Sequence, residues 1–178
     1  MPTHQSQCTH TWRITKYDPV LRNEAGHYTR EEWTFFAQVG DVVGGSLLTF
    51  EAYRRVEDAY VASALRFVAE ADVAPLQVAE LEESTLDAEF QRRIEDVPLA
   101  PEAVVNGGSV QGRELEALIR LNLREALWCK LLGSGFYIHF GWDYYMYIGS
   151  RSPCSNAIAS ARQAGLFVEE WVSPYAES

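Results

Sequence analysis

The feature that most constrains the fold is an aromatic stretch from Gly135 to Gly149, near the C-terminal end of the chain. It contains seven aromatic side chains, one histidine, one aspartate and a central glycine, Gly141. A glycine between two runs of strand-forming residues is typical of a β-hairpin. Large apolar side chains would lie on both faces of this hairpin, and both faces then need to be covered. We therefore expect it at the centre of a sheet.

The two faces of this hairpin depend on the length of its turn. A two-residue turn at Gly141 and Trp142 places His139 opposite Tyr144, and it puts His139 and Asp143 on opposite faces. In that register one face holds Tyr137, His139, Tyr144, Met146 and Ile148, and the other holds Phe136, Ile138, Phe140, Asp143, Tyr145 and Tyr147. A longer turn would shift the register by one residue and exchange the faces.

The rest of the chain shows both strand and helix patterns. Alternating apolar residues predict strands, and apolar residues at steps of three or four predict helices. We expect strands at residues 10–18, 76–81 and 166–172, and helices at residues 29–36, 50–71, 85–95, 112–132 and 156–164. The first of these helices would begin at a capping box, Thr29-Arg-Glu-Glu32.

This order of elements predicts the α+β class, with one domain over residues 1–178. We expect a mixed or mostly antiparallel sheet of about five strands, with the hairpin at its centre and helices covering it. Residues 1–9 are expected to form a flexible tail, and residues 97–110 a mobile loop.

The charge of the chain is strongly acidic and unevenly distributed. The net charge is −10, and between Glu70 and Glu102 there are ten acidic residues against two basic ones. Such a surface repels nucleic-acid phosphates and attracts a basic protein. The alternative interpretation is a solvated acidic face that keeps the protein soluble.

Compartment and cofactors are constrained by what the sequence lacks. No apolar run approaches the length of about 18 residues that a membrane helix needs. The first residues also lack the apolar core of a signal peptide, so we expect a cytoplasmic protein. The three cysteines, Cys8, Cys129 and Cys154, have no zinc-type spacing, and we expect neither a metal nor another cofactor.

Five segments of the chain combine unusual aromatic and charged residues: Trp12-Arg-Ile-Thr-Lys-Tyr-Asp-Pro19, the Glu32-Trp33 pair, Leu127-Trp-Cys-Lys130, His139-Phe-Gly-Trp-Asp-Tyr-Tyr-Met-Tyr-Ile-Gly149 and Gly165-Leu-Phe-Val-Glu-Glu170. Together they span nearly the whole chain. In these segments the chain resembles a family of uncharacterised bacterial proteins that has no established activity. The resemblance implies a compact bacterial domain and implies no mechanism.

Catalytic candidates are few. His139 could act as an acid or base, with Asp143 and Tyr145 as hydrogen-bonding partners for a small polar substrate. Cys154 precedes a predicted helix, whose dipole would lower the thiol pKa and make a Cys154–His139 pair conceivable. The alternative for His139 is a structural histidine in the core. The sequence has no nucleophile elbow, phosphate-binding loop or dinucleotide fingerprint.

The leading hypothesis is therefore a small acidic module that binds a basic protein partner, in the manner of an immunity protein or antitoxin. The residues expected to contact that partner are Trp142, Asp143, Tyr144, Tyr147, Glu82 and Glu83. The first alternative is a small-molecule enzyme with a pocket formed by His139, Asp143 and Tyr145 at the 136–149 hairpin. The second is a structural or regulatory domain. We expect a monomer or a homodimer, with no nucleic-acid or membrane partner.

Overall fold

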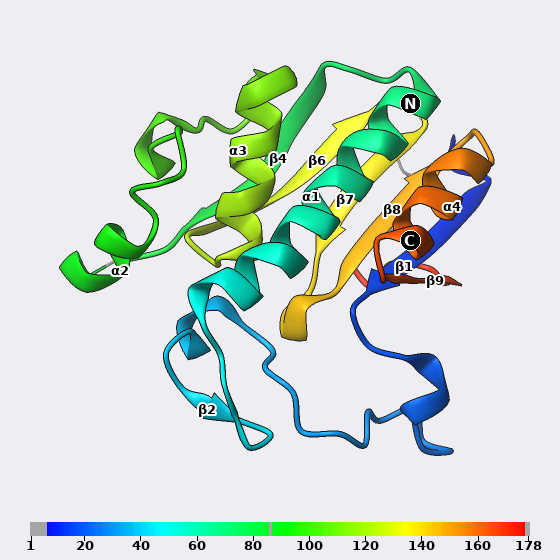
Figure 1. Ribbon diagram of the computed structural model, residues 1–178. Helices are drawn as coiled ribbons and strands as arrows, with labels where there is room; N and C mark the ends of the chain where they lie inside the picture. The colour runs from blue at the N-terminus through cyan, green and yellow to red at the C-terminus, as the bar shows by residue number, and fades with distance from the viewer. Residues whose placement is uncertain (1–6, 86, 177–178) are drawn as a thin grey trace.

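A seven-stranded sheet forms the centre of the computed structural model, which describes residues 7–85 and 87–176 (Figure 1). The strand order is β5-β4-β6-β7-β8-β1-β9, and every neighbouring pair is antiparallel. The strands are β1 His10–Thr15, β4 Leu76–Glu83, β5 Ser109–Val110, β6 Leu127–Gly133, β7 Phe136–Phe140, β8 Met146–Ser150 and β9 Phe167–Glu170. The predicted α+β class is confirmed, whereas the predicted number of about five strands is wrong.

Helices α1, α3 and α4 lie on one face of this sheet (Figure 1). The helices are α1 Phe50–Ala71, α2 Ala88–Arg93, α3 Gly112–Leu123 and α4 Ser155–Gln163. Helix α1 has the bounds that its apolar stripe predicts, and the Thr49 side chain caps it by accepting a hydrogen bond from the Ala52 amide. Beyond the hairpin tip, a long loop region carries the small ribbon of β2 Val42–Val43 and β3 Ser46–Leu47.

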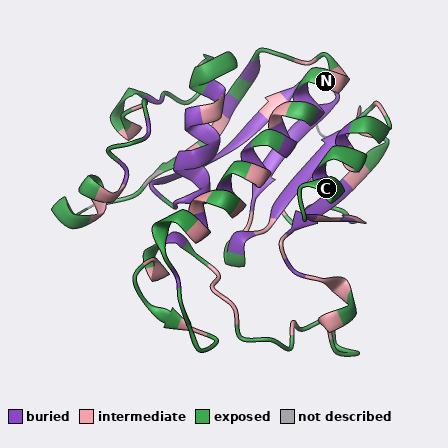
Figure 2. Cartoon of the chain, in the orientation of Figure 1, coloured by how far each residue is buried: buried purple, intermediate pink, exposed green. Residues whose placement is uncertain are grey.

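The aromatic hairpin is central, as its two apolar faces predict. Strands β7 and β8 lie in the interior of the sheet, and every residue of both strands is buried (Figure 2). Of the two turn lengths that the sequence allows, the structure has the longer one, because a 3-10 turn at Trp142–Tyr144 joins the strands and His139 pairs with Tyr147. The two faces are therefore exchanged. His139 now lies on the same face as Tyr147, as the longer-turn alternative requires.

The face of the sheet away from these helices, which we call the second face, is covered by the C-terminal segment 171–176. His139 Nδ1 lies 2.9 Å from the Ser173 hydroxyl, and the ring of Tyr175 lies 6.1 Å from that of Tyr147. Arg13 forms an ion pair with Glu169 on this face. The second face is thus a polar and aromatic layer, whereas the face under the helices is apolar.

The largest error of the sequence prediction is the helix over residues 112–132. Helix α3 ends at Leu123, and Leu127–Gly133 forms strand β6 between β4 and β7. An apolar run such as this one fits a buried strand as well as a buried helix. Glu125, with φ of 57°, reverses the chain between the two elements.

The predicted helix at residues 29–36 is also wrong, because the side chains of its capping box are used elsewhere. Thr29 Oγ1 donates to the Leu21 carbonyl at 2.7 Å. The Glu32 carboxylate accepts hydrogen bonds from Tyr28 and Lys16. Neither side chain is left to cap a helix, and the segment is irregular up to a 3-10 turn at Phe36–Gln38.

The predicted mobile loop at residues 97–110 and the end of the predicted tail at residues 1–9 both form hydrogen bonds with the sheet. Residues 97–110 include a 3-10 turn at Pro101–Ala103 and strand β5, which pairs with β4. Residues 1–6 of the predicted tail lie outside the described residues, and Thr9 bonds to Ser150 and Arg151 at the end of β8.

The close contact between Tyr137 and Gly149 gives a first prediction. The two residues are cross-strand partners, and a Cβ on Gly149 would lie 2.1 Å from the Tyr137 ring. We expect Gly149→Ala to lower the free energy of unfolding by about 1–3 kcal/mol, because the ring has no space to move within the packed layer. Urea denaturation measures this. Introduced into Tyr137→Leu, the same change should cost clearly less, and an equal cost in both backgrounds would contradict the explanation.

Candidate functional site

A groove lies at the hairpin tip, and we call it the tip groove. Its volume is about 520 Å³. Its lining includes the buried Phe140, three aromatic residues that are not buried, and three carboxylates; these last six are Trp128, Trp142, Tyr175, Glu80, Glu82 and Glu125. A second cavity of the same volume has mainly small and polar lining residues, such as Ser134 and Ser152. A specific ligand usually needs apolar walls with a few polar groups, so the tip groove is the better candidate.

The tip groove has two aromatic rings held in place by contacts, those of Trp128 and Tyr175, and one exposed ring, that of Trp142. Trp128 Nε1 donates a hydrogen bond to the Phe140 carbonyl at 2.7 Å, and the Trp128 ring lies 5.6 Å from that of Tyr175. Trp142 is 78% exposed. An exposed tryptophan beside fixed rings offers a large apolar area that a partner can cover at a small entropic cost.

Two of the three carboxylates have no cationic partner in the described part of the chain. Glu80 forms an ion pair with Lys130 at 2.7 Å. No ion pair of the described residues includes Glu82 or Glu125. Partial burial, and then the charge of Asp143, raise the pKa of the Glu125 carboxyl above its ordinary value. The groove is therefore a site of negative potential that a bound cation would neutralise.

Backbone strain is concentrated around the tip groove. Four of its residues and neighbours have the left-handed conformation, with φ of 50° at Glu80, 57° at Glu125, 56° at Asp143 and 65° at Tyr144. Each costs on the order of 1 kcal/mol for a residue with a side chain. Strained residues cluster at binding and active sites, where the surrounding structure holds them in place. This concentration supports a functional role for the hairpin tip.

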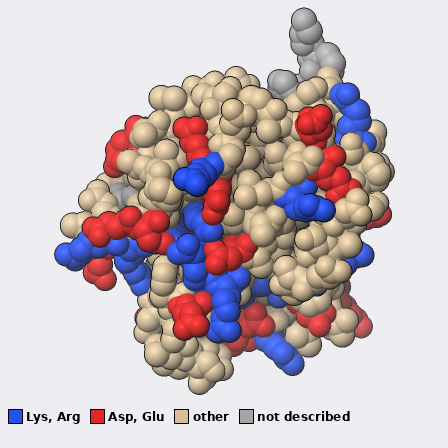
Figure 3. Space-filling model, turned by 45° about the horizontal axis from the view of Figure 1, so that its top comes forward, with Lys and Arg blue, Asp and Glu red and all other residues tan. Residues whose placement is uncertain are grey.

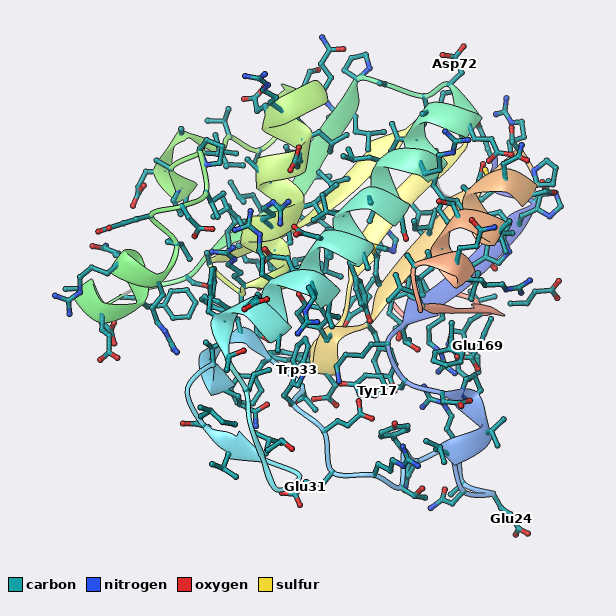
Figure 4. The ribbon with its side chains drawn as sticks, viewed as in Figure 1. Tyr17, Glu24, Glu31, Trp33, Asp72 and Glu169 are labelled. Carbon is teal, nitrogen blue, oxygen red and sulfur yellow. The ribbon has the colours of Figure 1, made fainter. Side chains whose placement is uncertain are left out.

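Buried tyrosine hydroxyls hold the strained tip. The Tyr17 hydroxyl donates to the Asp143 carbonyl at 2.8 Å, and the Tyr60 hydroxyl donates to the Tyr144 carbonyl at 2.9 Å. The Tyr144 hydroxyl in turn donates to the Tyr53 hydroxyl at 2.9 Å. Tyr17 lies beside Trp33 below the hairpin (Figure 4). These bonds preorganise the tip, and its exposed part is thus presented on a rigid support.

The tyrosine chain leads into a buried ionic network between α1 and α3. The Tyr53 hydroxyl donates to Glu57, whose side chain is fully buried. Arg124 Nε lies 2.7 Å from Glu57 Oε1, and Arg120 Nη1 lies 2.8 Å from Glu57 Oε2. Arg124 also pairs with Asp96 at 2.6 Å. Burial lowers the pKa of Arg124, but the hydrogen bonds that its guanidinium donates to Glu57 and Asp96 outweigh burial and raise this pKa above its ordinary value, so Arg124 stays charged in the core.

The three predicted catalytic residues do not form one site. His139 is fully buried, and burial and then the charge of Lys130 lower its pKa to about 3. Asp143 is exposed at the hairpin tip, and the Tyr145 hydroxyl accepts a hydrogen bond from Arg22 at 3.0 Å. A histidine that stays neutral throughout the physiological range is a poor acid catalyst.

The structure gives no support to the Cys154–His139 pair that the sequence left conceivable. Cys154 does precede α4, but it is buried, and burial raises the pKa of its thiol. Its Sγ donates to the Ser150 hydroxyl at 3.6 Å. Ser150 belongs to the face of β8 opposite to that of Tyr147, so Cys154 and His139 are on different sides of the sheet.

Of the predicted binding residues, Trp142 and Glu82 line the tip groove and Asp143 adjoins Glu125. Tyr144 and Tyr147 are buried and have no surface to offer. The side chain of Glu83 lies outside the described residues.

Of the six groove residues named above, the sequence prediction missed four: Glu80, Glu125, Trp128 and Tyr175. Glu125 and Trp128 fall within the wrongly predicted helix. Tyr175 is far from the hairpin in sequence, although its aromatic ring near the end of an otherwise polar segment was a usable signal.

The acidic region between Glu70 and Glu102 is partly used inside the fold. Glu70 caps α4 by accepting from the Ala157 amide at 2.6 Å, and Asp87 caps α2 by accepting from the Phe90 amide. Asp96 belongs to the ionic network and Glu80 pairs with Lys130. On the face in Figure 3, acidic and basic side chains are interspersed. Part of the acidic charge is therefore used inside the fold, and Glu82 is one of the carboxylates of this region that no ion pair of the described residues includes.

The depressed pKa of His139 predicts a pH dependence of stability. Its ordinary pKa is 6.5 and its folded value is about 3, so the unfolded chain binds more protons between these values. Stability from this residue is complete above pH 6.5 and falls with decreasing pH, by up to about 1.4 kcal/mol per pH unit. We expect the free energy of unfolding of His139→Gln to depend less on pH than that of the parent between pH 5 and 6.5. Parallel profiles in urea titrations would contradict this.

Comparisons of the chain with protein-family models, curated proteins and solved structures give no match. The resemblance to a bacterial family stays a prediction. No described helix is both long enough and apolar enough to cross a membrane. No three described His, Cys, Asp or Glu side chains are grouped so that they could hold a metal ion.

Proposed function

We propose that this protein binds a basic protein partner through the tip groove. The observation that carries the proposal is that two carboxylates, Glu82 and Glu125, lie in one groove with aromatic residues and form no ion pair within the described part of the chain. A cation that entered the groove would be attracted by both kinds of group. The groove then supplies the affinity, and the net charge of −10 supplies long-range attraction of the partner.

The rigidity of the site supports the same function. Binding costs less free energy when the contact residues are already ordered, and the tyrosine hydroxyls fix the tip before any partner arrives. A neutraliser of the immunity or antitoxin type, which must bind a basic enzyme tightly, would profit from such a preorganised anionic site. The enzyme alternative has less support, because His139, Asp143 and Tyr145 are not brought together.

Site-specific photo-crosslinking in the native host tests this proposal. A photoreactive phenylalanine analogue replaces Ser84, which lines the groove and is exposed, so the aromatic and acidic contact residues stay in place. We expect one predominant cross-linked protein with an isoelectric point above about 9, as expected for a partner attracted by an acidic groove. A predominant acidic partner, or no cross-linked protein at low ionic strength, would overturn the proposal.

Charge removal in the groove gives a quantitative prediction for the recovered partner. We expect Glu82→Gln combined with Glu125→Gln to weaken binding about 10-fold or more at low salt and to reduce its salt dependence, because charge complementarity is lost. Calorimetric titration at two ionic strengths measures both effects. The matched control is Glu89→Gln, an exposed carboxylate on α2 outside the groove. Equal weakening by the control would place the electrostatic attraction elsewhere.

A further inference from the structure

We infer that the cation received by the tip groove is a guanidinium group, so that the anchor of the basic partner is an arginine side chain. This inference rests on the proposed function and specifies its ligand. It starts from the arrangement of the groove. Glu82 comes from β4, where it is the cross-strand partner of Trp128, and Glu125 comes from the α3–β6 connection; all three line the groove.

The first argument is the number of available carboxylates. A guanidinium has five N–H donors in a planar fork and can bond to two carboxylates at once, whereas an ammonium is a compact point charge. This chain follows that distinction within its own fold. Its described lysine ion pairs, Lys16–Glu32 and Lys130–Glu80, have one carboxylate each. Arg120 and Arg124 each pair with carboxylates of more than one residue.

The second argument is the aromatic lining. Guanidinium groups are weakly hydrated and stack on aromatic faces. The second face of the sheet already contains such a site, because the Arg13 guanidinium lies 3.9 Å from the centre of the Trp171 ring while it pairs with Glu169 at 3.0 Å. The tip groove offers the same two elements, an indole ring and a carboxylate, with no arginine of the described chain paired to them.

The third argument is the energetic state of Glu125 before a partner binds. Its backbone is in the left-handed conformation, and its carboxyl lies near the like charge of Asp143. A bound guanidinium would relieve this repulsion and would be held between Glu125 and Glu82. A neutral side chain of the same shape would not relieve the repulsion and would not be attracted by the two carboxylates. The groove should therefore prefer a guanidinium over its neutral isostere.

Titration with blocked amino acids tests the inference without the partner. N-acetyl-arginine amide, N-acetyl-lysine amide and the neutral isostere N-acetyl-citrulline amide are added to the ¹⁵N-labelled protein. The indole N–H resonances of Trp128 and Trp142 are followed by NMR. We expect saturable binding of the arginine derivative, with affinity at least about 5-fold higher than that of the lysine derivative. The citrulline derivative should show no saturable binding.

Variants assign the binding to the groove. The double variant Glu82→Gln/Glu125→Gln should abolish the arginine-induced shifts, and Glu89→Gln should leave them unchanged, with amide spectra confirming that both variants are folded. Equal or tighter binding of lysine, no saturable binding of arginine, or arginine shifts that survive the double variant would each overturn the inference. A basic partner recovered by cross-linking would leave the proposed function standing in those cases. Arginine binding with an acidic partner would overturn the proposed function alone.

Discussion

Replacement of Glu57 by glutamine is expected to lower the free energy of unfolding by about 3 kcal/mol or more, because it leaves two buried arginines with too little negative charge. Glu57 is fully buried, and it contacts both Arg120 and Arg124 within 2.9 Å. Glutamine keeps the shape of the side chain, so the loss would come from charge and hydrogen bonding rather than from a cavity. Chemical denaturation of both proteins measures the effect.

Asp58→Asn is the matched control for this prediction. Asp58 neighbours Glu57 and pairs with the same Arg120, at 2.7 Å, but half of its side chain is exposed. Solvent screens such a pair, and we expect a cost below about 1 kcal/mol. If Asp58→Asn cost as much as Glu57→Gln, burial would not be what makes the network important.

The ionic network also connects stability with the proposed site. Glu57 accepts a hydrogen bond from Tyr53, which accepts one from Tyr144 at the hairpin tip. Loss of the Glu57 charge should therefore loosen the tip as well as the helices. Hydrogen exchange of the amides of residues 141–145 would report this, and the exchange should be faster in Glu57→Gln than in Asp58→Asn.

The sequence predicted those parts of the fold that local patterns determine. The stripe of apolar residues gave α1 its bounds, and the two apolar faces of the aromatic stretch placed the hairpin in the interior of the sheet. Strand β6 was missed although its pairing with β7 is local, across a turn at Ser134 and Gly135; its pairing with β4 joins residues that are distant in sequence. A contiguous apolar run does not show whether the segment forms a buried helix or a buried strand.

The tip groove could be predicted only in part for the same reason. Trp142 was identified from its place at the hairpin tip, whereas Glu125 and Trp128 were assigned to a helix that does not exist there. The groove arises when β6 pairs with β4 and the C-terminal segment crosses the second face. Both arrangements depend on tertiary contacts. The residues next to Glu125 in the sequence do not predict its left-handed backbone conformation.

Trp142→Ala is expected to weaken binding of the basic partner about 30-fold or more while leaving the stability of the free protein nearly unchanged. Trp142 is 78% exposed, so its removal uncovers little of the core, and exposed surface changes usually alter stability by less than about 0.5 kcal/mol. In a complex, the same indole would be buried against the partner, and a central tryptophan commonly contributes 2 kcal/mol or more, which corresponds to about 30-fold in affinity.

Trp171→Ala separates this effect from a general loss of aromatic surface. Trp171 is also exposed, at 48%, but its ring packs against the guanidinium of Arg13 on β1. It does not line the tip groove. Its removal should change partner affinity by less than about 3-fold, within the range of residues at the edge of an interface. Calorimetric titration of both variants with the cross-linked partner decides between them. A larger loss for Trp171→Ala would move the interface to the β1–β9 edge of the sheet, because the Arg13–Glu169 pair and Tyr145 would then surround the contact instead of Glu82 and Glu125.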